Sequence, residues 1–241
     1  MSTTTSTDNS GLLTFLLPKY EAKCGCKVRY VAVGTGAALK LGENGDADVM
    51  LVHARKAEDE FIAKGYGANR RDVMYNDFVL VGPKADPAGV SGMKDVLAAL
   101  KKIKSSGAPF ISRGDDSGTN KMELGYWKQV GIDPKGPAYM AIGQGMGQTL
   151  TVAGEKRGYT LADRATYATY QDRTGLEILV EGDSKMFNPY GVIAVNPKRH
   201  PGVNYDGAMA FIKWITSDEG QREIAAFRPK GAQLFYPDAG K

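Results

Sequence analysis

The sequence of 241 residues predicts an α/β protein. Short apolar, β-branched runs alternate with segments whose apolar residues recur every three or four positions, the pattern of strands that alternate with helices. Several runs are followed directly by glycine, serine or threonine and then by a helical pattern, as in parallel βαβ units. Hydrophobic residues make up 42% of the chain and charged residues 24%, which is usual for a globular protein.

The first third of the chain shows this alternation. The segment 11–20 has apolar residues at positions 12, 13, 16, 17 and 20, which form a helical stripe. The segment 27–33 is β-branched and predicts a strand. No strand is visible ahead of the hydroxyl-rich run at 3–7. The other elements expected here are a helix over 34–41, a buried strand over 47–52, a helix over 56–64 and a long strand over 73–81.

The rest of the chain continues the pattern. The segment 92–105 is amphipathic, a short strand at 110–111 leads into a helix over 119–130, and the run 160–163 predicts the cap of another helix. The further elements expected are strands over 138–142, 176–180 and 191–195, and helices from the glycine-rich run 143–147 to about 156, over 205–215 and over 218–227.

The order of elements predicts two lobes. The middle third can form a βα domain of its own, entered and left through strands, so we expect lobe I to comprise 1–79 and 191–241 and lobe II to comprise 80–190. Two crossing segments make a hinge, and a ligand cleft is expected between the lobes, at the loops that follow the carboxyl ends of strands. A hinged binding protein of this kind is expected to be a monomer.

Charge and motifs exclude several functions. The net charge of +4 suits an anionic ligand but is too dispersed for nucleic acid. Leu39 stands where the third glycine of a dinucleotide-binding G-x-G-x-x-G would be, and the chain has no P-loop, G-x-S-x-G or H-E-x-x-H motif. We therefore expect no cofactor, no metal site and no enzyme. Met1 is followed at once by polar residues, which indicates the mature form of an exported protein or else a cytoplasmic one.

Cys24 and Cys26 are the only cysteines, and they leave three interpretations open. Two cysteines are too few for a zinc site or a disulfide framework. A C-x-C pair could close a small ring, bind a soft metal or consist of two idle thiols. The favoured interpretation is two idle thiols.

Four loops have the composition of anion-binding turns. Each is rich in glycine, serine or threonine and precedes a helix, whose N-terminus offers unpaired N–H groups and a positive dipole end. They are the runs 3–7, 34–37, 112–119 and 143–147. The third adds Arg113, whose planar fork of donors suits an oxyanion.

For the other ionisable residues near these loops, a purely structural role competes with a functional one. Asp115 and Asp116 could serve as a catalytic carboxylate pair, but beside Arg113 they are better placed to hold its guanidinium and cap the helix. His53 follows a buried strand and could border the cleft or be structural. His200 is expected in a surface turn.

The motifs resemble a known family. The pattern R-x-x-x-S-G-T at 113–119 resembles the phosphate-binding loop of periplasmic phosphate-binding proteins. The whole chain is similar to the tungstate-binding proteins of bacterial tungstate ABC transporters. That similarity lies in T-T-T-S at 3–6, V-H-A-R-K-A-E at 52–58, N-R-R-D-V-M-Y-N-D-F at 69–78 and G-Q-G-M-G at 143–147.

The resemblance implies a type II periplasmic binding protein fold, with an oxyanion closed between two lobes and then delivered to a membrane permease. It implies a periplasmic location and tungstate as ligand, with molybdate as a close second. The residues that it places at the ligand are Thr4, Thr5, Ser6, Thr35, Gly36, Arg113, Ser117, Gly118, Thr119, Gly145 and Met146, the last two through backbone N–H groups.

The resemblance also bears on selectivity. Phosphate-binding proteins place an aspartate in the cleft to accept the proton of hydrogen phosphate, whereas the matching segment here puts His53 near that spot. A site without a buried acceptor carboxylate favours a fully deprotonated dianion, because tungstate would leave such an acceptor unpaired. The alternatives are a molybdate-, sulfate- or phosphate-binding protein on the same scaffold, an α/β enzyme with Asp115 or Asp116 as base, and a cytoplasmic anion sensor.

Overall fold

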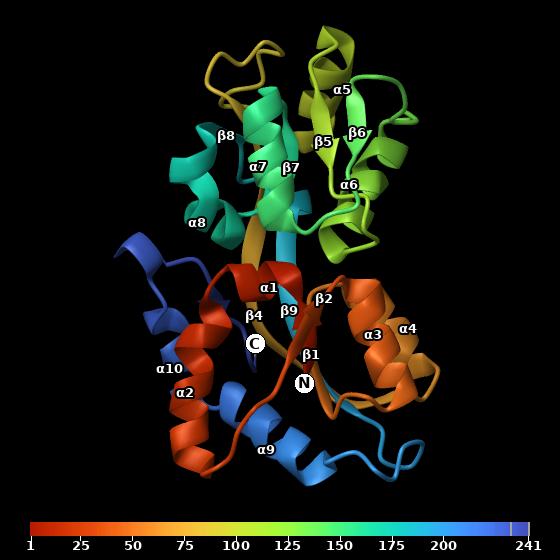
Figure 1. Ribbon diagram of the computed structural model, residues 1–241, viewed down its shortest axis with the longest axis vertical. Coiled ribbons are helices and arrows are strands. Elements are labelled where there is room, and N and C mark those ends of the chain that lie inside the picture. The colour runs from red at the N-terminus through yellow and green to blue at the C-terminus, as the bar shows by residue number, and fades with distance from the viewer. Residues whose placement is uncertain (232, 241) are drawn as a thin grey trace. The chain divides into compact units, whose positions relative to one another are not determined.

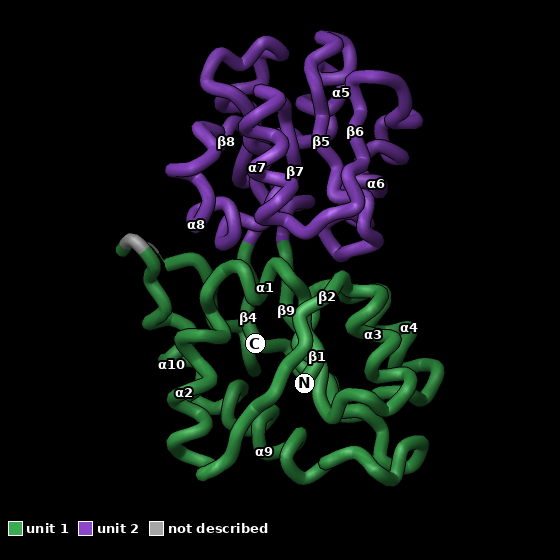
Figure 2. The backbone as a smooth tube through the Cα atoms, viewed as in Figure 1, with its two compact units in different colours: residues 1–76, 188–241 green, residues 77–187 purple. Residues whose placement is uncertain are grey.

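The computed structural model describes residues 1–231 and 233–240, and the chain divides into two compact α/β units. Unit 1 comprises Met1–Asn76 and Asn188–Lys241, and unit 2 comprises Asp77–Phe187 (Figure 2). The chain passes from unit 1 to unit 2 within one long strand, β4 (Gly67–Pro83), and returns at the start of β9 (Phe187–Val195). Each unit buries its own apolar side chains.

Unit 1 is built on a mixed sheet in the order β10-β4-β9-β3-β1-β2. The strands β1 (Ser2–Thr4), β2 (Val31–Val33) and β3 (Val49–Val52) are parallel, whereas β9 runs antiparallel to β3, and β10 (Tyr236–Pro237) runs antiparallel to β4. The prediction of parallel βαβ units is therefore wrong for β4, β9 and β10. Each of these pairs with a strand distant in sequence, and a local pattern cannot reveal such a partner.

Helices cover both faces of this sheet (Figure 1). On one side α3 and α4 pack through Leu39 and Phe61 on Met50 and Val52. On the other, Tyr20 of α2 contacts Phe211 and Trp214 of α9. The bounds of the helices are α1 (Thr5–Asn9), α2 (Leu12–Cys24), α3 (Thr35–Asn44), α4 (Arg55–Ala63), α9 (Tyr205–Ile215), α10 (Asp218–Ala226) and the 3₁₀ turn η2 (Pro229–Gly231).

The first strand, β1, was not expected from the sequence, because its residues are hydroxylic and not apolar. They are nevertheless buried, since their hydroxyls find acceptors inside the unit. Ser2 Oγ donates to the Ala38 carbonyl at 3.1 Å, and Thr3 Oγ1 donates to the Leu51 carbonyl at 2.8 Å. Buried polar groups are tolerated when they are paired in this way.

Unit 2 has β4 at its centre, and alternate residues of that strand face opposite ways. Phe78 and Leu80 enter one apolar cluster with α5 and α6, whereas Val79 and Val81 enter another with α7 and α8. The strands β7 (Thr160–Asp163) and β8 (Leu176–Val180) pair antiparallel with β4, and β5 (Phe110–Ser112) pairs parallel with β6 (Tyr139–Ala141). The helices are α5 (Val96–Ser106), α6 (Gly118–Gln129), α7 (Met146–Lys156), α8 (Arg164–Thr174) and the 3₁₀ turn η1 (Ser184–Met186).

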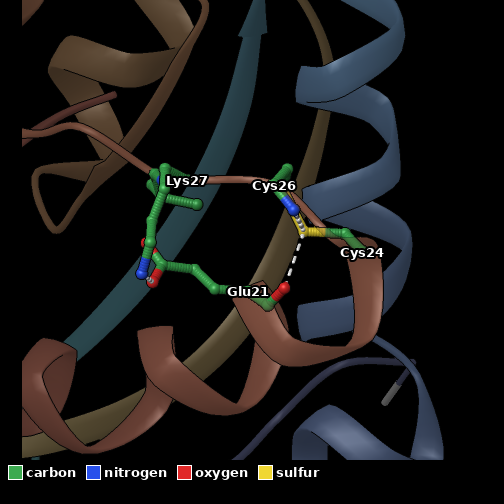
Figure 3. The surroundings of a disulfide bond; sticks show 5 residues. Glu21, Cys24, Cys26 and Lys27 are labelled. Atoms are coloured by element: carbon green, nitrogen blue, oxygen red, sulfur yellow. Dashed lines mark hydrogen bonds and ion pairs between the residues drawn. A yellow bond between two sulfur atoms is a disulfide. The ribbon is translucent and has the colours of Figure 1, made fainter.

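The two cysteines form a disulfide at the end of α2 (Figure 3). The interpretation as idle thiols is therefore wrong, and the first alternative, a small closed ring, is correct. Gly25 ends the helix in the left-handed conformation, with φ 63°, and the Cα atoms of Cys24 and Cys26 lie 5.2 Å apart, a normal bridging distance. The ring depends on this turn, which the spacing of the cysteines alone does not specify.

Candidate functional site

In unit 1, three parallel strands lead into helices at one edge of the sheet. β1 is followed by α1, β2 by α3 and β3 by α4. Because the carboxyl ends of parallel strands share an edge, the first turns of these helices and their N–H groups gather there. Two of the four predicted loops, 3–7 and 34–37, belong to this edge.

Thr4 organises the first loop. Its Oγ1 caps α1 by accepting the Thr7 N–H at 3.3 Å, and it lies 2.7 Å from Thr7 Oγ1 and 3.1 Å from Ser6 Oγ. Thr4, Ser6 and Thr7 are buried, while Thr5 is half-buried at the first position of the helix. The structure thus brings two of the predicted hydroxyls, those of Thr4 and Ser6, into one hydrogen-bonded cluster with Thr7.

His53 lies directly after β3 and joins this cluster. Its Nε2 is 3.0 Å from Thr4 Oγ1 and 3.1 Å from Ser6 Oγ. Its Nδ1 is 2.9 Å from Asn188 Oδ1, and its ring stacks on Tyr190 with centroids 4.7 Å apart. Since the amide oxygen of Asn188 can only accept, Nδ1 carries the hydrogen. His53 therefore orients the Thr4 and Ser6 hydroxyls. This structural role is compatible with the other interpretation, in which His53 borders the cleft.

The second loop places Thr35 and Gly36 at the start of α3. Gly34 occupies the cap position with an extended backbone and offers no side chain, so the first N–H groups of this helix receive no side-chain cap from it. Thr35 is fully buried and Gly36 is half-buried. Both lie on the same edge of the sheet as Thr4.

In unit 2 the corresponding edge carries Arg113, which follows β5 and is only 2% exposed. Asp115 holds its guanidinium, with Oδ2 accepting from Nη2 at 2.6 Å and from Nε at 3.2 Å. Gly114 between them has φ +61°, and a Cβ there would lie 2.9 Å from the Cβ of Ala141. The predicted role of Asp115 as the holder of Arg113 is confirmed. Asp116 does not hold the guanidinium of Arg113. Its Oδ2 pairs instead with Lys121 Nζ at 3.0 Å.

The start of α6 follows Arg113 after a turn of three residues. Ser117 is the cap of this helix, and its Oγ accepts the Asn120 N–H at 3.1 Å, so the cap is serine and not aspartate. Gly118 and Thr119 form the first turn and are buried. Thr119 Oγ1 has no hydrogen-bond partner among the described residues, although the side chain is only 1% exposed. A buried hydroxyl in this state calls for an explanation.

Glu123 supports this loop through hydrogen bonds, and its role was not predicted from the sequence. It is a buried carboxylate whose Oε2 accepts from Ser112 Oγ and whose Oε1 accepts from Trp127 Nε1 at 2.9 Å and Tyr139 Oη at 2.8 Å. Burial raises its pKa, and these hydrogen bonds oppose that rise. The only local signal was a glutamate on the apolar face of a helix, four residues before Trp127.

The fourth loop is tied to Arg113 through the backbone. The Gln144 N–H donates to the Arg113 carbonyl at 3.1 Å, and the Ile142 N–H donates to the Ser112 carbonyl at 3.1 Å. Gly145 caps α7 without a side chain. The Met146 side chain is buried in an apolar cluster, so only its backbone N–H is available to a ligand.

A buried carboxyl also lies at this edge. Asp163 ends β7, caps α8 by accepting the Thr166 N–H at 2.8 Å, and has no exposed surface. Burial raises its pKa, while Thr166 and the charge of Arg113 lower it. The expected cap at 160–163 is confirmed as Asp163, although these residues also form a strand. The expectation that the segment 47–54 supplies no acceptor carboxylate is a separate matter and stays a prediction.

Within residues 1–231 and 233–240 no three histidine, cysteine, aspartate or glutamate side chains are grouped as metal ligands. None of the described helices has both the length and the apolar character needed to cross a bilayer. His200 is half-buried next to a surface turn, and its Nε2 contacts the Glu43 carbonyl at 2.8 Å.

Two α/β units linked by two chain crossings are the architecture of a solute-binding protein. A family model described as the PBP superfamily domain matches residues 1–219. The chain is also 50% identical over 245 residues to the tungstate-binding protein TupA of Peptoclostridium acidaminophilum, a match that covers 100% of this chain and 86% of that protein.

Two solved structures are similar throughout. The tungstate ABC transporter protein of Geobacter sulfurreducens is 56% identical, with a TM-score of 0.87 over 94% of this chain and 97% of that one. The tungstate-binding protein TupA of Desulfovibrio alaskensis G20 is 50% identical, with a TM-score of 0.82 over 99% and 98%. The chain therefore belongs to the family of tungstate-binding proteins within the PBP superfamily. The predicted fold class and the resemblance are confirmed.

Proposed function

We propose that this protein binds tungstate as a tetrahedral oxyanion and delivers it to the permease of an ABC transporter. It does so as an equilibrium binder and not as an enzyme, without a cofactor, as a monomer outside the cytoplasmic membrane. The full-length similarity to tungstate-binding proteins of two genera supports the ligand and the transporter.

One observation carries the proposal at the level of residues. Arg113 is 2% exposed, is held by Asp115 at 2.6 Å, and stands shortly before the first turn of α6, where the Thr119 hydroxyl is buried without a hydrogen-bond partner among the described residues. A fixed cation beside a helix N-terminus is a site for an anion. Tungstate oxygens would accept from the guanidinium, from this hydroxyl and from the N–H groups of Gly118 and Thr119.

The remaining donors complete the assignment. In unit 1 we assign Thr4, Thr5, Ser6, Thr35 and Gly36, whose hydroxyls and N–H groups lie on one sheet edge. In unit 2 we assign Ser117 as the capping residue that shapes the loop, together with the N–H groups of Gly145 and Met146.

The enzyme alternative has little support in the geometry. Asp115 is already engaged by Arg113, and Asp116 is exposed and paired with Lys121. Neither carboxylate is left as a general base beside a nucleophile, which catalysis of this kind requires.

Titration calorimetry tests the proposal. The protein is titrated with tungstate alone and then in competition with molybdate, sulfate and phosphate. We expect one site per chain and an affinity in the nanomolar range or tighter, which corresponds to roughly −12 kcal/mol or more negative. Displacement by sulfate or phosphate at equal concentration would overturn the ligand, and a stoichiometry of two would overturn the single site per chain. Molybdate is expected to compete most strongly, because its size and charge are almost those of tungstate.

A further inference from the structure

The carboxyl of Asp163 is incompletely satisfied. Its side chain has no exposed surface, and Oδ1 accepts the Thr166 N–H at 2.8 Å. Oδ2 has no hydrogen-bond partner within the described part of the chain. Capping of α8 therefore explains one of the two oxygens and leaves the other unexplained.

The topology of unit 2 places this carboxyl beside the Arg113 loop. Phe110 of β5 forms a parallel bridge with Tyr159, and the Ile111 N–H donates to the Tyr159 carbonyl at 2.8 Å. Because β5 and β7 run side by side in the same direction, Arg113 and Asp163 leave the sheet at the same edge. The charge of Arg113 acts on the Asp163 carboxyl, which agrees with this placement.

The charges around Asp163 favour its neutral form once an anion is present. Burial is the largest influence and raises its pKa, and the opposing influences are hydrogen bonds from Thr166 and the charge of Arg113. Arg164, the next residue, is paired with two carboxylates at 2.7 Å, and Glu123 of α6 is held by three donors. A dianion bound at Arg113 would offset the guanidinium charge and repel an ionised carboxylate, so it would raise the pKa of Asp163 further.

We propose that Asp163 is a specificity-determining residue of the anion site, whose neutral carboxyl donates the Oδ2 hydrogen to an oxygen of the bound anion. This inference rests on the proposed function. With Asp163 as a donor, the groups assigned to the anion in unit 2 include no ionised carboxylate, and the Thr119 hydroxyl is the one side chain among them that can also accept. Tungstate, molybdate and sulfate meet such a set with four acceptor oxygens, whereas the hydroxyl of hydrogen phosphate would find no carboxylate to accept its proton.

The test compares Asp163→Asn and Asp163→Ala with the unaltered protein. Asparagine caps helices as well as aspartate does and its amide is a donor that does not titrate, whereas alanine removes both functions. Affinity for tungstate is measured by calorimetry from about pH 6.5 to about pH 9, a range in which tungstate remains a dianion. Circular dichroism of each ligand-free variant confirms that it is folded.

The unaltered protein should lose affinity as the pH rises above the pKa of Asp163 in the free state, by up to tenfold per pH unit, because binding then requires uptake of a proton. Asp163→Asn should bind with an affinity that varies much less with pH, and any contribution from His53 is common to both proteins. Asp163→Ala should bind roughly 10- to 100-fold more weakly at low pH, since one charge-assisted hydrogen bond is lost.

Two results would overturn the inference: the first leaves the proposed function intact, and the second would also overturn tungstate as the proposed ligand. The first is an equal pH dependence in the unaltered protein and Asp163→Asn, which would reduce Asp163 to a helix cap. The second is tighter binding of phosphate than of tungstate by the unaltered protein together with loss of phosphate binding in Asp163→Asn, which would make the carboxylate a proton acceptor. Failure of the unaltered protein to bind any of the anions at any pH would instead overturn the proposed function, and this inference with it.

Discussion

Removal of the Arg113 guanidinium is the perturbation whose effect the structure defines best. The side chain is 2% exposed and Asp115 fixes it through Nε and Nη2, so the rest of the fork is presented in one orientation. Two charge-assisted hydrogen bonds to an oxyanion would contribute roughly 3–6 kcal/mol, at 1.5–3 kcal/mol each. Arg113→Ala should therefore raise the dissociation constant for tungstate by roughly 10²–10⁴-fold.

Arg113→Lys separates charge from geometry. Lysine keeps the charge but lacks the planar fork, so we expect a loss of affinity about tenfold or more, smaller than that of alanine. Arg70→Lys is the matched control, because Arg70 is also a largely buried arginine, 11% exposed, in an ion pair with Glu58 at 2.8 Å, but has no assigned role at the ligand. It should lower thermal stability and leave affinity unchanged. Calorimetry and thermal unfolding of the ligand-free proteins measure the two effects, and tungstate binding by Arg113→Ala with undiminished affinity would refute the site.

Three further predictions concern stability and are measured by chemical or thermal unfolding of the ligand-free protein. Glu123→Ala should cost about 3 kcal/mol or more, because two buried donors and one half-buried donor lose their acceptor, and a cost below about 1 kcal/mol would contradict the network. Gly154→Ala should cost roughly 1–3 kcal/mol, since its Cβ would lie 2.5 Å from a carbonyl oxygen at the end of α8, whereas Gly125→Ala, with nothing within 4 Å, should stabilise by about 0.5–1 kcal/mol. Reduction of the bond between Cys24 and Cys26 should cost no more than about 1.5 kcal/mol, because the closed loop is so short, and a cost of several kcal/mol would show that the ring holds more than its own turn.

Part of the fold could be predicted from local patterns. The helix over 205–215 and the strand over 176–180 have the bounds that the sequence predicts, because each has a clear apolar period and polar ends. The strand β1 could not be found in this way. Ser2 and Thr3 are buried by pairing with carbonyls of residues 36 and 48 positions further along the chain, and no local period encodes such partners.

The residues of the candidate site also differ in whether local sequence patterns could predict them. Thr4, Ser6 and Arg113 could be named because hydroxyls and a cation before helical patterns are a local signature of anion binding. Glu123 and Asp163 could not. Their importance follows from burial and from neighbours on other elements, and in the sequence they look like an ordinary helical glutamate and an ordinary cap.

The sequence by itself determined the alternation of strands and helices, the anion-binding character of its loops and the likeness to tungstate-binding proteins, because all three depend on residues close together along the chain. Tertiary structure alone decided which strands run antiparallel, that Cys24 and Cys26 are joined, and that Asp163 is buried at the same sheet edge as Arg113. The physical reason is that pairing, burial and the electrostatic surroundings of a carboxyl are set by residues distant in sequence, and these meet only when the chain is folded.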